Sequence, residues 1–268
     1  MTVCCLQNNE AVIKMLLCTD VGNTNIKFAL YKGDELLMKM RFSTNRKKTA
    51  DDYAVDLYSI FQINNVDIRS ISGSIISSVV PIISEPLKHA IKTVTGIDST
   101  VVGPGVKTGL DIRLDNPATV GSDLVCTCVA VKELYPCPAI VVGLGTATTI
   151  LYMNENRAYC GGTILPGVQI SLDALTSNAA LLPSINLSEP KKVIGTNTAD
   201  CIRNGIIYGT ASMIDGMIER YEQEVHKSCT HLATGGFAST IAKFCSKEII
   251  VNDDLVLDGL RIIYKRNK

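Results

Sequence analysis

The apolar and polar positions along the chain predict the same order of elements twice. In the first half, the pattern predicts strands over 15–22, 25–31 and 34–43, a helix over 50–63, a strand over 71–77, a helix over 81–95 and a strand over 99–102. In the second half, it predicts three strands within 139–164, helices over about 167–182 and 198–227, a strand over 231–234, a helix over 237–245 and a strand over 248–251. The repeated order is typical of two α/β layers, and we expect a cleft between them.

The segment 103–117 contains Gly103-Pro104-Gly105 and Asp115-Asn116-Pro117, which are loop signals, so it predicts the linker. We therefore assign 1–14 to an N-terminal extension, 15–116 to a first domain and 117–268 to a second. Pro117 suits the first position of a helix running to about Glu133, with Asn116 as its N-cap. The extension is polar and lacks the apolar core of a signal peptide.

Composition narrows the class of protein. Lys and Arg total 26 and Asp and Glu total 26, and no basic arm or stripe is present, so we expect no nucleic-acid partner. No segment reaches the ~18 consecutive apolar residues of a membrane span, so we expect no membrane contact. The chain has 10 cysteines but only 3 histidines and no C-x-x-C pair. That pattern favours reduced thiols in a cytoplasmic protein over a zinc site.

Two glycine turns are the main candidates for chemistry. Residues 20–24 read Asp-Val-Gly-Asn-Thr and residues 143–147 read Gly-Leu-Gly-Thr-Ala, and each lies between two apolar runs. Such a hairpin tip offers backbone N–H groups and side-chain donors at one point, which suits a phosphate. Taken singly, the first also fits a turn in which Asp20 caps the backbone, and the second an ordinary β-turn.

Two further motifs each fit two interpretations. Asp123 lies near the start of the helix predicted from Pro117, where it fits either a surface carboxylate favoured by the helix dipole or a general base. The segment 234–236, Thr-Gly-Gly, follows a predicted strand and fits either a simple turn or a platform for a nucleotide base or ribose.

Taken together and in order, these motifs resemble the type III pantothenate kinases of the acetate/sugar kinase, heat-shock-protein-70 and actin superfamily. The matching pieces cover nearly the whole chain from Met15 onward: 20–25, 77–81, 103–110, 115–117, 121–123, 145–149, 161–167, 195–198, 234–236 and 254–260. The resemblance implies two actin-like (ribonuclease H-like) α/β domains with a nucleotide cleft between them. It also implies ATP-dependent phosphorylation of pantothenate to 4'-phosphopantothenate, the first step of coenzyme A biosynthesis, by a homodimer that uses Mg2+ and a monovalent cation, K+ or NH4+.

The same resemblance implies roles for individual residues. Asp123 is the expected catalytic base, and Asp20 is expected to organise the metal–phosphate site. The nucleotide-binding set is expected to be Asp20, Gly22, Asn23, Thr24, Lys27, Gly145, Thr146, Thr148, Gly235 and Gly236. The residues expected to enclose pantothenate are Gly109, Gly121 and Thr198.

Three positions depart from the family pattern, which has Asp at Gly143, Arg at Leu124 and Tyr at Leu114. The position of Gly143 is the one associated with the monovalent cation. An alternative hypothesis is therefore a catalytically weak or substrate-shifted paralogue, acting as a nucleotide-binding regulatory protein or as a kinase for another small alcohol. Release of ADP on addition of pantothenate separates these hypotheses.

Overall fold

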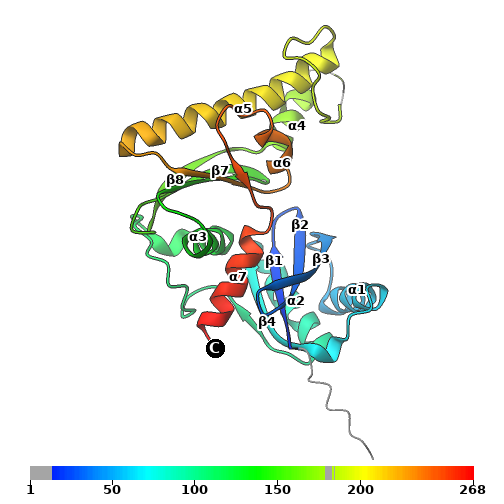
Figure 1. Cartoon of the computed structure of the whole chain (residues 1–268). Coiled ribbons are helices and arrows are strands. Elements are labelled where there is room, and N and C mark those ends of the chain that lie inside the picture. Colours follow the sequence, from blue (N-terminus) through cyan, green and yellow to red (C-terminus); the bar gives the residue numbers. More distant parts are fainter. Residues whose placement is uncertain (1–13, 179–182, 184) are drawn as a thin grey trace, which may run out of the picture. The chain divides into compact units, whose positions relative to one another are not determined.

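The computed structural model describes residues 14–178, 183 and 185–268 (Figure 1). Within it the chain divides into a first unit up to Val106 and a second unit, Lys107–Asn267, each with its own sheet. This division falls inside the segment 103–117 in which the sequence places the linker. The predicted N-terminal extension lies outside the described residues, except for Lys14.

The first unit is a five-stranded sheet with two helices on one face. Its elements are β1 (Met15–Val21), β2 (Asn25–Lys32), β3 (Glu35–Ser43), α1 (Ala50–Ile63), β4 (Ile71–Ser78), α2 (Pro81–Thr95) and β5 (Ser99–Val101). The strand order is β3-β2-β1-β4-β5, with β1 antiparallel to β2 and parallel to β4. Alternate residues of β1, Leu17 and Val21, enter the core with Leu57 of α1 and Leu87 of α2.

Local chemistry explains why both helices begin where the sequence predicts. Thr49 and Asp52 form a reciprocal capping box at the start of α1. Pro81 occupies the first turn of α2, where its missing N–H costs no hydrogen bond, and Gly96 ends that helix with a φ of 73°. These signals are local, so the bounds of α1 and α2 agree with the predicted 50–63 and 81–95.

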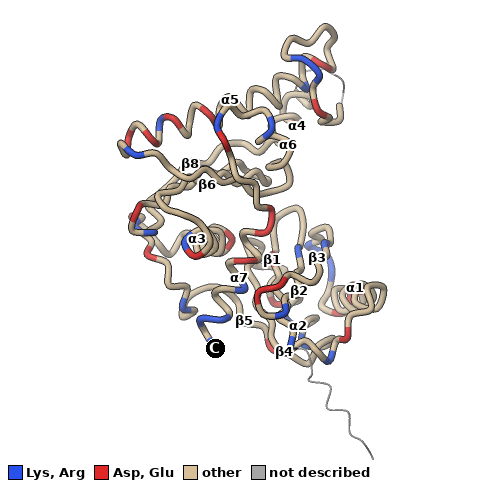
Figure 2. The backbone as a smooth tube through the Cα atoms, in the orientation of Figure 1, with Lys and Arg blue, Asp and Glu red and all other residues tan. Residues whose placement is uncertain are grey.

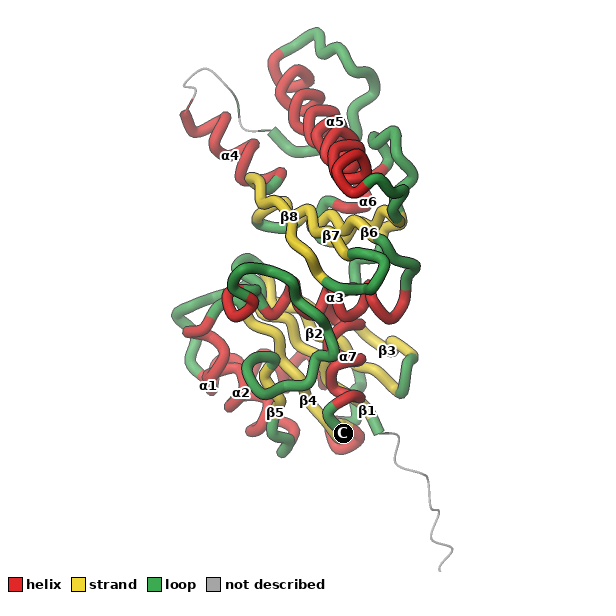
Figure 3. The backbone as a smooth tube through the Cα atoms, turned by 90° about the vertical axis from the view of Figure 1, so that its left-hand side faces the viewer, coloured by secondary structure: helices red, strands yellow, loops and turns green. Residues whose placement is uncertain are grey.

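The second unit repeats the sheet and adds helices. Its elements are α3 (Ser122–Leu134), β6 (Ala139–Leu144), β7 (Ala147–Met153), β8 (Tyr159–Pro166), α4 (Val168–Asn178), α5 (Thr198–Val225), β9 (Thr230–Thr234), α6 (Ala238–Ala242), β10 (Ile250–Val251) and α7 (Leu255–Arg266). The strand order β10-β9-β6-β7-β8 is the order of the first sheet read from its other edge. Figure 3 shows α5 on one side of this sheet and α3 on the other.

Each face of the second sheet has its own core. Val142, Leu144 and Ile150 pack with α5 and α6, whereas Val141 and Leu151 pack with α3. Burial on both faces explains why the central strand β6 is a continuous apolar run, whereas burial alternates along the edge strand β8.

The predicted helix over 117–133 is wrong at its start. Pro117–Thr119 form a short 3-10 helix, Val120 and Gly121 are extended, and α3 begins only at Ser122. Asn116 makes no capping hydrogen bond through its side chain. The β-branched Thr119 and Val120 and the following glycine are poor helix formers, which explains the interruption. As a consequence, Asp123 lies in the first turn of α3.

The hydrophobic pattern does not predict helix α7, although the segment 254–260 is one of the family matches. It packs against α3, and a Cβ on Gly259 would lie within 2.8 Å of Cys126 Cα, so glycine permits a close crossing of the two helices. Smaller differences concern the ends of two helices. Helix α5 ends at Val225, because His226 adopts a left-handed conformation with a φ of 53°. The predicted end of α4, 179–182, lies outside the described residues. Among the described residues, no helix is both long and apolar enough to cross a membrane.

Candidate active site

The first hairpin joins β1 to β2 and carries an acidic residue at its base. Asp20, which is 8% exposed, lies opposite Lys27 of β2 and Ser77 of β4 on the sheet face away from α1 and α2. Directly opposed residues in a sheet have Cβ atoms about 5 Å apart, so a carboxylate and an ammonium group share this face. Gly22 closes the turn by donating its N–H to Asn25 O at 3.0 Å. A low-exposure carboxylate beside a glycine turn suits a cation–phosphate site.

The tip of this hairpin is held by the loop that follows β3. Thr44 donates its N–H to Thr24 O at 2.9 Å and its hydroxyl to Gly22 O at 2.7 Å. Arg46 donates through Nη2 to Asn23 Oδ1 at 3.2 Å. No sequence motif singles out Arg46, although the run Arg46-Lys47-Lys48 is a visible signal for positive charge. The structure thus adds a guanidinium group to the predicted phosphate hairpin.

The second hairpin joins β6 to β7 and is built from backbone. Gly145 and Thr146 form its exposed tip, closed by the N–H of Gly145 donating to Ala147 O at 3.1 Å. Gly235, with a φ of 104°, lies against its base, since a Cβ there would be 2.5 Å from Leu144 O. Gly236 has open space around it. The structure therefore brings the predicted residues of both motifs to one end of the second sheet.

Thr148 differs from its predicted neighbours. Its side chain is 0% exposed and points to the sheet face that packs with α5 and α6, because it lies opposite Leu144 on β6. Thr148 Oγ1 has no hydrogen-bond partner within the described residues. The hydroxyl is thus placed in the core of the second unit, away from the exposed tip formed by Gly145 and Thr146.

Gly143 lies opposite Thr149 on the other face of the same hairpin. A Cβ at position 143 would be 2.5 Å from Thr149 Oγ1, so the threonine hydroxyl occupies the space that a side chain at 143 would enter. In place of the acid of the first hairpin, this one presents a hydroxyl and backbone groups.

Asp123 is partly buried in the first turn of α3, two residues after Gly121. Burial raises the pKa of its carboxyl above the ordinary value of 3.8, and the N–H of Leu124, which donates to Asp123 Oδ1 at 2.8 Å, opposes that rise. Removing a carboxylate from water favours its protonated form. A carboxyl with a raised pKa is suited to exchange a proton with a substrate hydroxyl.

Three apolar residues near Asp123 in the sequence pack against the core of the second unit. Leu114, Val120 and Leu124 are partly buried and pack against the core cluster beneath α3. Two of these residues, Leu114 and Leu124, are positions at which the chain departs from the family pattern. The structure therefore uses them as packing residues.

The remaining predicted substrate residues do not lie with Asp123 along α3. Lys132 Nζ donates to Gly109 O, so Gly109 contacts the side chain of a residue near the C-terminal end of this helix. The guanidinium of Arg266 fills the space beside Gly109, whose φ is 68°. Thr198 is the first residue of α5, on the opposite face of the sheet from α3. Gly121 lies two residues before Asp123, and the predicted roles of Gly109 and Thr198 stay predictions.

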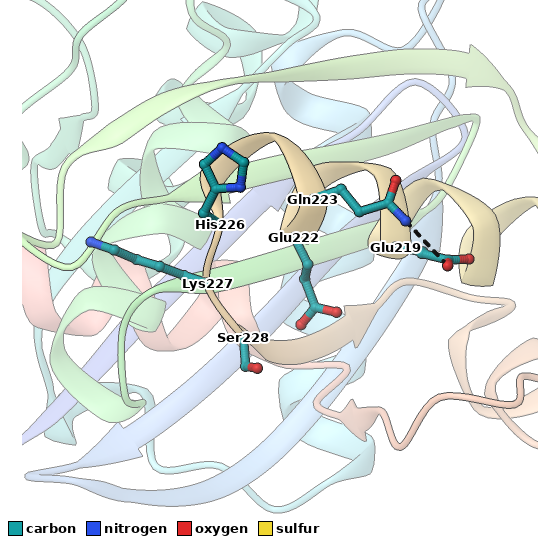
Figure 4. Close-up of a pocket in the computed structure, with 6 residues that line it drawn as sticks. All are labelled: Glu219, Glu222, Gln223, His226, Lys227 and Ser228. Carbon is teal, nitrogen blue, oxygen red and sulfur yellow. Dashed lines mark hydrogen bonds between the residues drawn. The ribbon is translucent and has the colours of Figure 1, made fainter.

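A separate pocket lies at the end of α5, lined by Glu219, Glu222, Gln223, His226, Lys227 and Ser228 (Figure 4). Glu222 accepts the N–H of Cys229 at 2.9 Å and faces His231 Nε2 at 3.0 Å. These contacts join the last turn of α5 to the start of β9. None of the predicted site residues lines this pocket, so we leave it out of the candidate site.

A family model described as type III pantothenate kinase matches residues 16–220 of this chain. The type III pantothenate kinase of Exiguobacterium sp. is 44% identical over 254 residues, covering 95% of this chain and 100% of that protein. That of Moorella thermoacetica is 43% identical over 253 residues, covering 94% and 100%.

Solved structures resemble the chain in fold at low identity. The activator of the 2-hydroxyisocaproyl-CoA dehydratase from Clostridium difficile, with bound ADPNP, has a TM-score of 0.56 and 13% identity, covering 93% of each chain. Component A of the (R)-2-hydroxyglutaryl-CoA dehydratase from Acidaminococcus fermentans has a TM-score of 0.55 and 14% identity, covering 95% of this chain and 100% of that one. These likenesses confirm the predicted actin-like α/β fold.

Proposed function

The chain belongs to the type III pantothenate kinase family, and we propose on that basis that it phosphorylates pantothenate with ATP, giving 4'-phosphopantothenate and ADP in the first step of coenzyme A biosynthesis. The structural observation that carries the proposal is Asp123, a partly buried carboxyl with a raised pKa in the first turn of a helix. The extent of the likeness, 95% of this chain at 44% identity, supports the same conclusion.

Asp123 is the proposed base of the transfer. Its carboxylate takes the proton of the pantothenate hydroxyl as that oxygen forms a bond to the terminal phosphorus of ATP. The bond from this phosphorus to the bridging oxygen breaks, and ADP leaves with the electron pair. The transition state is loose, so positioning and charge stabilisation by the surrounding groups matter more than covalent chemistry by the protein.

The two hairpins are the proposed phosphate contacts. Gly22, Asn23, Thr24 and Lys27 contribute from the first hairpin. The tip of the second contributes Gly145 and Thr146, and Gly235 and Gly236 lie beside it. We propose a different role for Thr148, because its buried hydroxyl fits packing better than contact with a phosphate.

The residues present fit Mg2+. Asp20 supplies a carboxylate of low exposure at the base of the first hairpin. No group of three or more His, Cys, Asp or Glu among the described residues suits a metal cage. Mg2+ is commonly held by one or two carboxylates together with water and substrate phosphates, and Asp20 supplies such a carboxylate. When bound, Mg2+ neutralises charge that develops on the phosphate oxygens, and Asp20 would hold it.

The residues do not fit a monovalent cation held by a carboxylate at position 143. Gly143 has no side-chain oxygen, and the hydroxyl of Thr149 occupies the space beside it. The proposed mechanism therefore contains no step that depends on K+ or NH4+. Comparing turnover in K+, NH4+ and Na+ buffers tests the dependence that the resemblance implies.

We propose that the protein is a homodimer. Ile164 on the edge strand β8 is 76% exposed, and Ile170 and Leu175 on α4 are 44% and 42% exposed. Exposed apolar side chains on neighbouring elements are typical of an interface. Light scattering of the unaltered protein and of Ile164→Asp tests this assignment, since a charge at the interface shifts a dimer to monomer.

A cytoplasmic location completes the proposal. The eight described cysteines are free thiols, as expected in a reducing compartment. Burial raises the pKa of the Cys245 thiol to about 12, which makes it a poor nucleophile.

The deciding experiment measures ADP release by purified protein with Mg-ATP, with and without pantothenate. The proposal expects release that depends on pantothenate and stops in Asp123→Asn. ATP binding without any pantothenate-dependent release would reject the proposed substrate and favour the nucleotide-binding regulatory alternative.

A further inference from the structure

We propose that Arg46 is a phosphate-recognition residue of the first hairpin. This inference rests on the proposed function, since it assigns Arg46 to the same ATP site. The residue lies outside every motif that identifies the family from the sequence. Only the fold brings it to the hairpin tip, where Nη2 lies 3.2 Å from Asn23 Oδ1.

The loop that carries Arg46 is fixed at both sides. Before it, Thr44 makes its two hydrogen bonds to the backbone of Gly22 and Thr24. Next to Arg46, the carbonyl of Asn45 accepts the hydroxyl of Tyr53 at 2.7 Å, and the side chain of Tyr53 is 0% exposed. A guanidinium on a fixed loop loses less conformational freedom when a ligand arrives than one on a mobile loop.

The neighbouring basic residues have different surroundings. Lys48 forms an ion pair with Asp56 and lies 5.8 Å from the centre of the Tyr53 ring, so its charge is directed to α1. The Lys47 backbone donates to Asn45 Oδ1, and its side chain is exposed. Figure 2 shows the basic residues of this loop in blue beside β3. Within the described part of the run, Arg46 is the residue whose side chain hydrogen-bonds to the hairpin tip.

The contact with Asn23 gives Arg46 two effects. Since Asn23 Oδ1 accepts from the guanidinium, the amide NH2 of Asn23 is oriented as a donor, and a phosphate oxygen is an acceptor. Arginine has five N–H donors in a planar fork, so one bond to Asn23 leaves donors for a phosphate. Arg46 thus contributes its own charge and sets the orientation of Asn23.

The test compares the binding of ATP, ADP, AMP and adenosine to the unaltered protein, Arg46→Ala, Arg46→Lys and Lys47→Ala, by calorimetry without pantothenate. A charged hydrogen bond at an exposed site is expected to give about a tenfold change in dissociation constant. Arg46→Ala should weaken ATP and ADP by about that factor and leave adenosine unchanged. Lys47→Ala is the matched control, since it removes the same charge from the adjacent exposed position, and it should have a much smaller effect. Arg46→Lys should recover part of the loss.

A double-mutant cycle tests the positioning effect. Asn23→Ala and Arg46→Ala should be less than additive for ATP binding, because each removes the same contact. Equal weakening by Arg46→Ala and Lys47→Ala, equal loss for adenosine and ATP, or full additivity would each overturn the proposal. Because binding is measured without pantothenate, a failure of turnover alone rejects the proposed substrate and leaves this inference standing. Failure of the unaltered protein to bind ATP rejects both.

Discussion

The two hairpins have one topology and two kinds of chemistry. The first carries Asp20 and Lys27 opposite one another and is braced by Arg46, so its contribution is charge. The second has Gly143 at the position of the acid and is enclosed by the backbone of Gly235. The duplicated sheets supply the same turn at two places, and the side chains at each turn determine which chemical groups it presents. We therefore propose that cation binding depends on the first hairpin and that the second contacts phosphate through uncharged groups.

The largest expected effect concerns Asp123, the proposed base, which belongs to neither hairpin. Asp123→Asn should lower kcat by about 100- to 10,000-fold and leave ATP binding unchanged, because an amide cannot accept the proton as a carboxylate does. Steady-state kinetics and calorimetry measure the two quantities. A variant that retains turnover would remove Asp123 as the base.

The same variant has a stability consequence that depends on pH. Since burial raises the pKa of Asp123, its carboxyl favours the folded state at low pH and loses that contribution as pH rises from 3.8 through the raised pKa. The free energy of unfolding of Asp123→Asn, relative to the unaltered protein, should therefore increase as pH rises through that window. Urea denaturation at several pH values would detect it, and a constant difference would contradict a buried carboxyl.

The second prediction tests the asymmetry of charge. Asp20→Asn should lower turnover by about 100-fold at fixed Mg2+ and raise the Mg2+ concentration needed, because it removes the carboxylate proposed to hold the ion. A Mg2+ titration of activity measures both. The reverse change, Gly143→Asp, should destabilise the fold unless Thr149→Ala makes room for the new side chain. Equal sensitivity at positions 20 and 143 would break the comparison.

The third prediction tests the backbone enclosure of the second hairpin. Gly235→Ala should lower the free energy of unfolding by about 2 kcal/mol, because it places a Cβ 2.5 Å from Leu144 O and strains a φ of 104°. Gly236→Ala is the matched control, since nothing lies within 4 Å of its Cβ position. Thermal unfolding of the two variants provides the measurement, and equal destabilisation would show that the contact with Leu144 is unimportant.

The smallest expected effect concerns Thr148. Thr148→Val should stabilise the protein by about 1 kcal/mol, since it replaces a buried hydroxyl that has no partner among the described residues. ATP binding should stay the same. Weaker ATP binding by this variant, measured by calorimetry, would show that Thr148 contacts the phosphates after all.

The fold was largely predictable because its signals are local or periodic. The capping box at Thr49, the helix start at Pro81 and the apolar runs of β1 and β6 appear in the sequence. The start of α3 was misplaced because Pro117 and Gly121 give competing signals, and the tertiary structure uses both.

The candidate site was predictable where it consists of a continuous motif. Within each hairpin the tip residues are neighbours, and Gly121 is a neighbour of Asp123, because each set belongs to one short continuous segment. The role of Gly109 as a substrate contact stays a prediction, and the structure adds that this glycine has a left-handed conformation beside the guanidinium of Arg266. These two residues are far apart in the sequence, and no local pattern links them.

The sequence by itself determined the two sheets, the two glycine hairpins and the family, because strand periodicity and turn chemistry depend on neighbouring residues. Only the tertiary structure decided which hydroxyl is buried, which acid has a raised pKa and which of three basic residues reaches the hairpin tip. Those properties depend on burial and on contacts across strands and loops, and packing alone fixes them.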